Sequence, residues 1–83
     1  MIINYQVKLA AFDADTESRV YVEVPCTSLR RAKQTLARWA HKYGVKGGLD
    51  VRNMVLSEDP ATRRKAFKND RYDGYVTVTI LGG

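Results

Sequence analysis

The sequence predicts a small α+β domain in which one main helix packs across one face of a single mixed sheet. Two stretches near the start of the chain, residues 3–11 and 20–24, alternate side chains with the period of half-buried strands. Residues 29–43 repeat apolar side chains with helical periodicity, and residues 75–81 alternate again. With 45% apolar and 28% charged residues, which is ordinary for a globular chain, residues 1–83 are expected to form one domain.

The first two strands are expected to form an antiparallel hairpin. In the first, one face is expected to carry Ile3, Tyr5, Val7, Leu9 and Ala11. In the second, Val20, Val22 and Val24 alternate with Tyr21 and Glu23, and Pro25 ends the strand. The polar segment 13–18 between them has the length of a hairpin loop, so the two strands are expected to pair with each other.

The main helix is bounded by recognisable capping residues. Ser28 or Thr27 is the candidate N-cap, and Gly44 is the C-cap glycine. A stripe of about 100° on the helix surface is apolar. It contains Leu29, Ala32, Leu36, Trp39, Ala40 and Tyr43. We therefore expect this stripe, including Trp39, to be part of the core and to pack on the hairpin.

The second half of the chain is less regular. Residues 49–56 are predicted as a third strand. Asp59 as N-cap and Pro60 at the first helical position predict a short basic helix over residues 61–68. Asp73-Gly74 is typical of a turn, and it precedes the final strand.

The net charge of +5 is concentrated in two segments. Residues 27–46 contain basic residues and no acidic ones, and residues 61–72 contain five basic residues against Asp70. The predicted partner-binding basic face consists of Arg30, Arg31, Arg38, Lys42, Arg63, Arg64 and Lys65. This distribution favours an acidic partner, either a protein or a nucleic acid.

The residue types that carry catalysis or bind metals are sparse. His41 is the only histidine and has no Cys, Asp or Glu at ligand spacing, so no metal site is predicted. No nucleophile–base pair or phosphate-binding glycine loop is present, so we expect neither an enzyme nor a cofactor. The single Cys26 is expected to be a buried thiol. Without a signal peptide or an apolar membrane span, a cytoplasmic protein is expected.

The order of the elements predicts that the first and last strands lie in parallel at the centre of the sheet, joined by a right-handed crossover. With that arrangement the chain resembles ubiquitin and the other β-grasp proteins. The likeness rests on the opening Met1-Ile2-Ile3 strand, the hairpin, the helix capped by Gly44 and the closing strand. Its one specific motif is the terminal Leu81-Gly82-Gly83.

The resemblance implies that the protein is a substrate of a modification pathway. In ubiquitin-like modifiers and the related sulfur carriers, an E1-type activating enzyme adenylates the C-terminal carboxylate. By this resemblance Gly83 is the acyl donor, Gly82 gives clearance in a narrow channel and Leu81 anchors the tail. Target proteins, a conjugating enzyme and a deconjugating protease are then the expected partners. The basic charge favours a protein modifier over a sulfur carrier, and the sulfur carrier stays an alternative.

A second hypothesis is a small basic module that binds nucleic acid or inhibits a nucleic-acid-handling complex. The basic face defined above would contact phosphates, with Lys68 and Arg71 adding to it. Tyr21 and Tyr75 would share the open face of the sheet and stack on bases.

Overall fold

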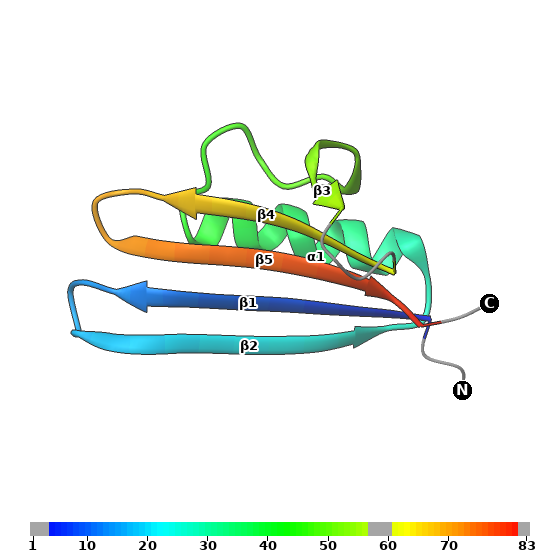
Figure 1. The fold of residues 1–83 in the computed structure, drawn as a ribbon, viewed down its shortest axis with the longest axis horizontal. Coiled ribbons are helices and arrows are strands. Elements are labelled where there is room, and N and C mark those ends of the chain that lie inside the picture. The colour runs from blue at the N-terminus through cyan, green and yellow to red at the C-terminus, as the bar shows by residue number, and fades with distance from the viewer. Residues whose placement is uncertain (1–3, 57–60, 82–83) are drawn as a thin grey trace.

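The computed structural model describes residues 4–56 and 61–81 and has one helix packed on a five-stranded sheet (Figure 1). The strands are β1 (Tyr5–Asp13), β2 (Ser18–Cys26), β3 (Val55–Leu56), β4 (Thr62–Lys68) and β5 (Tyr72–Ile80). The helix is α1 (Leu29–Lys42), and a 3₁₀ turn, η1 (Val51–Asn53), precedes β3. The strand order is β2-β1-β5-β4-β3. The predicted α+β class, with one helix across one face of a single sheet, is confirmed.

The first and last strands lie side by side at the centre of the sheet, but their predicted parallel pairing is wrong. β1 and β5 are antiparallel, with Tyr5 opposite Ile80 and Asp13 opposite Tyr72. The reason lies in β4, which runs in the same direction as β1 and turns back through a tight hairpin into β5 (Figure 1). All four pairings in the sheet are antiparallel. The architecture remains compatible with a β-grasp-like arrangement in having its terminal strands adjacent under one helix.

The predicted short helix over residues 61–68 is also wrong, because this segment is strand β4. Its alternation is hidden in the sequence, since Arg63 and Lys65 occupy the same face as the buried Phe67. Pairing of the whole of β4 with β5 satisfies the hydrogen-bonding groups of the backbone and overrides the local helical preference. Asp59 and Pro60, the predicted helix start, lie outside the described residues. Of the predicted strand over residues 49–56, only β3 is extended, and η1 occupies its centre.

The turn predicted at Asp73-Gly74 is displaced. Both residues lie inside β5, where Asp73 pairs with Phe12 and Gly74 pairs with Ala11. The turn itself forms earlier, where Asn69 accepts hydrogen bonds from the backbone N–H groups of Arg71 and Tyr72 through its side-chain oxygen. An asparagine that binds the backbone two residues ahead is a common turn device, and here it takes precedence over the Asp-Gly pair.

The main helix agrees with its predicted boundaries. Ser28 has extended backbone and accepts a hydrogen bond from Arg31 N–H at 3.3 Å through its hydroxyl. Gly44 follows the C-cap residue Tyr43 and has φ of 64°, the left-handed conformation that favours glycine at a helix end. Ala32, Leu36 and Trp39 are buried as expected, whereas Leu29 is exposed.

The core lies between α1 and one face of the sheet. Val7, Leu9, Val76 and Val78 come from the two central strands, and α1 contacts β1 and β2. Val45, Leu49 and Met54, from the segment between α1 and β3, belong to the same buried cluster. No helix among the described residues is long and apolar enough to cross a membrane.

Candidate functional site

One face of the sheet has no described helix over it, and we call it the open face. Side chains alternate across each strand, so the residues of β1 that follow the buried Val7, Leu9 and Ala11 point the opposite way. In Figure 1 the described segments leave β2, β1 and β5 uncovered on the side away from α1. The cross-strand register fixes which residues of the five strands are neighbours on this face.

Three aromatic side chains surround a small residue on the open face. Ala10 of β1 pairs with Tyr21 of β2 on one side and with Tyr75 of β5 on the other. Phe12 lies two residues further along β1, on the same face. Tyr21, Phe12 and Tyr75 are 62%, 46% and 38% exposed. Because Tyr21 and Tyr75 are two strands apart, about 10 Å separates their backbones, and only a methyl group lies between them.

Basic side chains surround these rings. The register places Arg19 opposite Phe12 and Lys8 opposite Thr77, and Thr77 is opposite Arg64. The guanidinium of Arg64 lies 4.1 Å from the centroid of the Tyr75 ring, within range of a cation–π contact. Lys68 is at the far end of β4, opposite Asp73. Among the described strand residues, four cations therefore share the open face with two carboxylates, Glu23 and Asp73.

Glu23 accepts two hydrogen bonds within the open face, and each of its carboxylate oxygens can accept a further one. Tyr21 donates its hydroxyl to Glu23 Oε2 at 2.9 Å, and Gln6 donates its side-chain amide to the other carboxylate oxygen. The bond to Glu23 raises the pKa of Tyr21 above its ordinary value, which further favours the neutral hydroxyl. Tyr21 is thus held at one edge of the face as a neutral aromatic surface.

The structure does not bring the predicted basic face together. Arg30, Arg31, Arg38 and Lys42 are exposed on α1, on the side of the sheet opposite the open face. Arg64 is the one member of the predicted set that lies on the open face. Arg63 and Lys65 alternate with it and lie on the helix side, where Lys65 Nζ donates to Gly48 O at 2.8 Å. Six of the seven residues therefore lie on the helix side of the sheet, and Arg64 alone lies on the open face.

Leu81, the first residue of the predicted conjugation motif, is exposed immediately after β5. Its backbone N–H donates to Asn4 O at 2.8 Å, so pairing with the first strand continues to this residue. Gly82 and Gly83, which would carry the acyl chemistry, lie outside the described residues.

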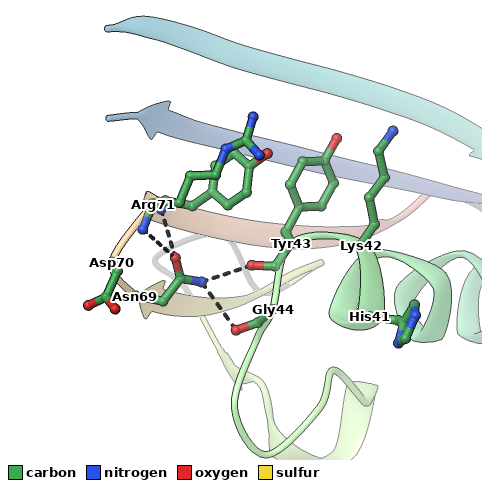
Figure 2. A pocket seen from close by; sticks show the side chains of 8 residues that line it. His41, Lys42, Tyr43, Gly44, Asn69, Asp70 and Arg71 are labelled. Atoms are coloured by element: carbon green, nitrogen blue, oxygen red, sulfur yellow. Dashed lines mark hydrogen bonds between the residues drawn. The ribbon is translucent and has the colours of Figure 1, made fainter. Parts of the chain in front are cut away.

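A surface pocket of about 390 Å³ lies between the end of α1 and the β4–β5 turn (Figure 2). Two polar side chains in its wall, Asn69 and Arg71, have protein partners. Asn69 Nδ2 donates to Tyr43 O at 2.8 Å and to Gly44 O at 3.1 Å. Arg71 donates to the buried Asp13 carboxylate from Nε at 3.1 Å and from Nη2 at 3.2 Å, which lowers the pKa of Asp13. These contacts hold the sheet end together, and they favour a structural role for the pocket.

The part of the chain that the structure describes contains no cluster of three or more His, Cys, Asp or Glu side chains that could hold a metal ion. His41 is exposed at the end of α1, and Figure 2 shows its ring directed away from the Asn69 hydrogen bonds. Cys26 is buried, as predicted, which makes its thiol a structural group.

Sequence reasoning placed Tyr21 and Tyr75 on one face but missed Phe12, Lys8 and Arg19. The alternation of β1 continues to Asp13, two residues past the last apolar position that defined the predicted strand. If the predicted strand had been continued to Asp13, the alternation of side chains would have placed Phe12 on the same face as Lys8 and Ala10. The position of Ala10 between Tyr21 and Tyr75 depends on how β1 is aligned with β2 and β5. The sequence pattern does not specify this register.

In comparisons with known proteins, the chain matches no family model, no curated protein and no solved structure. The function is therefore inferred from the chemistry of the open face and of the C-terminal motif.

Proposed function

We propose that the protein binds single-stranded nucleic acid on the open face of its sheet. The observation that carries this proposal is the group of exposed rings, Phe12, Tyr21 and Tyr75, around Ala10, with Arg64 packed on Tyr75. Exposed aromatic rings on an uncovered sheet provide stacking surfaces for unpaired bases, and stacking contributes about 1–3 kcal/mol per base.

The geometry suits an extended strand that crosses the sheet. Bases stack on Tyr21 and Tyr75, while the low surface over Ala10 leaves room for the backbone or a further base beside Phe12. Lys8, Arg19, Arg64 and Lys68 neutralise phosphates. With four such contacts, a plot of the logarithm of the binding constant against the logarithm of the salt concentration is expected to have a slope of about −3 for single strands. Duplex nucleic acid offers no exposed base faces, so we expect it to bind more weakly and to be released by moderate salt.

The test measures the binding of fluorescent oligouridine and oligothymidine by anisotropy, with a duplex of the same length for comparison. Tyr21→Ala and Tyr75→Ala are each expected to weaken single-strand binding about tenfold or more, because each removes a stacking surface. Tyr21→Phe and Tyr75→Phe keep the ring and are expected to bind nearly as the wild type does. Preference between oligouridine and oligodeoxyuridine, which differ only in the 2′-hydroxyl, would show whether the sugar is read.

A matched pair of arginine variants locates the phosphate contacts. Arg64→Ala, on the open face, is expected to reduce both affinity and the salt slope, whereas Arg38→Ala, on α1, is expected to change neither. The proposal is wrong if the tyrosine variants bind normally, or if Arg38→Ala is the variant that weakens binding. The latter result would assign the ligand to the helix surface.

The C-terminal motif supports a second candidate function, that of a ubiquitin-like modifier, with the sulfur carrier as its alternative. Leu81 is exposed at the end of a central strand and directly precedes Gly82-Gly83. Against it, the antiparallel β1–β5 pairing departs from the parallel pairing that the resemblance implies.

This candidate requires activation of the Gly83 carboxylate, which is expected to be visible by intact mass spectrometry after incubation with ATP and a lysate of the source cells. An adenylate, a thiocarboxylate or a protein adduct should form on the wild type and vanish when Gly83 is deleted. The size of the adduct separates the modifier from the sulfur carrier. Identical spectra for the two proteins would remove this candidate.

A further inference from the structure

β2 is a nine-residue strand at the edge of the sheet, and no other described strand pairs with its outer side. Its outward backbone groups follow from the hydrogen bonds of its neighbours. Leu81 N–H donates to Asn4 O, so the even-numbered residues of β1 bond toward β5. The odd-numbered residues of β1 then bond toward the even-numbered residues of β2. Within β2, the backbone groups of Arg19, Tyr21 and Glu23 consequently point outward.

Pro25 agrees with this assignment. It lies in β2 opposite Gln6, in the set of residues whose backbone points outward. Proline has no N–H, and in a strand it is accommodated where that group would face solvent at an edge. The outer edge of β2 therefore offers three outward N–H groups, those of Arg19, Tyr21 and Glu23, and Tyr21 is the central one.

We propose that a second copy of this chain pairs antiparallel with this edge, with Tyr21 of each copy on the two-fold axis. A symmetric antiparallel pair needs a self-complementary strand. With Tyr21 opposite Tyr21, Arg19 of each copy lies opposite Glu23 of the other, which forms two ion pairs on the open face. On the helix side, Val20 lies opposite Val22 twice. Every outward N–H of Arg19, Tyr21 and Glu23 then meets an outward carbonyl.

The neighbouring symmetric registers are less favourable. A pair centred on Val22 places Arg19 opposite Pro25, which loses both ion pairs and leaves the Arg19 carbonyl without a donor. A pair centred on Val20 places Glu23 opposite Glu17, a like-charge contact. Charge therefore favours the register centred on Tyr21 over its two nearest neighbours, all three of which keep the same faces aligned.

The paired sheet is continuous across both copies. On its open face the residues run Tyr75, Ala10, Tyr21 and then the same residues of the second copy in reverse order. The pairing does not depend on what binds to the open face, and failure of nucleic-acid binding would leave it intact. If both hold, Arg19 pairs with Glu23 and leaves Lys8, Arg64 and Lys68 of each copy for phosphates, and the dimer presents one uninterrupted aromatic surface of twice the length.

Sedimentation equilibrium tests the ion pairs. The wild type is expected to be a dimer at high micromolar concentration. Arg19→Glu and Glu23→Arg each place like charges opposite one another twice, and each is expected to raise the dimer Kd at least about tenfold. The double variant Arg19→Glu/Glu23→Arg restores both pairs with reversed polarity, and it is expected to dimerise again. Arg30→Glu, a charge reversal on α1, is the matched control and should dimerise like the wild type.

Disulfide trapping tests the register. Residues opposite each other in a hydrogen-bonded pair have Cα atoms about 5.5 Å apart, which lies within disulfide range. Tyr21→Cys is therefore expected to form a covalent dimer on oxidation. Arg19→Cys is not expected to do so, because the two equivalent positions are four residues, or about 13 Å, apart along the strands. Cys26 is 3% exposed, and the wild type controls for its reactivity.

Each result has a definite reading. A monomeric wild type overturns the proposal, as does a dimer whose Kd is unaffected by either single reversal. Cross-linking of Arg19→Cys as readily as Tyr21→Cys overturns the register. Failure of the swapped double variant to dimerise, with its fold confirmed by circular dichroism, would assign the association to a contact other than Arg19–Glu23.

Discussion

Replacing Gly74 by alanine is expected to be the most destabilising single change described here. An added Cβ would lie 2.1 Å from Ala10 O, 2.4 Å from Ala11 Cα and 2.7 Å from Ala11 Cβ. All three atoms belong to β1 and are backbone atoms or fixed to it, so none moves by a side-chain rotation. The central strands β1 and β5 would have to separate, with the core behind them. We expect a loss of about 3 kcal/mol or more, a large part of the roughly 4–12 kcal/mol available to a domain of this size.

Urea denaturation followed by Trp39 fluorescence measures this loss. Gly48→Ala is the matched control, because Gly48 has φ of 72° and no atom within 4 Å of the added Cβ. Its alanine variant carries only the strain of the left-handed conformation, about 1 kcal/mol. Equal losses for the two variants would mean that β1 and β5 adjust to the extra methyl group, contrary to our expectation.

Asn69→Ala is expected to have the second largest effect, because one side chain joins the helix end to the β4–β5 turn. Its amide donates to the carbonyls of Tyr43 and Gly44, and its oxygen accepts from the N–H groups of Arg71 and Tyr72 (Figure 2). Four hydrogen bonds at about 0.5–1 kcal/mol each predict a loss of roughly 2–4 kcal/mol. Thermal unfolding by circular dichroism should show a fall in Tm of the order of 10–20 °C.

Asn4→Ala is the comparison for Asn69. Asn4 makes one side-chain hydrogen bond, from Nδ2 to Thr27 O at 2.9 Å, so its replacement should lower stability by about 1 kcal/mol. If the two variants unfold at the same temperature, the four bonds of Asn69 are replaced by water without loss, and the turn does not depend on them.

The strongly periodic elements were predictable, and the weakly periodic ones were not. β1, β2, α1 and the end of β5 show clear alternation or a helical stripe, and each overlaps its predicted segment, although β2 continues through Pro25, which was predicted to end it. β4 was missed because the charged residues Arg63 and Lys65 occupy its half-buried face. Only the apolar stems of their long side chains are covered, so the sequence shows no alternation of apolar and polar residues. The direction of β5 follows from β4, which is why one misassigned segment also changed the predicted pairing.

The candidate site was predictable only in part. Period alone placed Tyr21 and Tyr75 on one face, but the register that puts Ala10 between them comes from the folded sheet. Clustering in sequence suggested that the basic residues form one surface, whereas Arg64 points to the open face and the other six lie on the helix side. The function inferred from the terminal glycines stays a prediction, because Gly82 and Gly83 are outside the described residues.

The pairing of β1 with β5 has a consequence for how the chain folds. The β1–β2 and β4–β5 hairpins join residues close in sequence, and such contacts form rapidly. The pairing between β1 and β5 joins residues from nearly opposite ends of the chain, with Tyr5 opposite Ile80. Closing that long loop accounts for most of the entropic barrier to folding. The two local hairpins are therefore expected to form early, and their docking through β1 and β5 is expected to be the slower step. The rate of folding should therefore be set by the strand pair that Gly74 allows to approach closely.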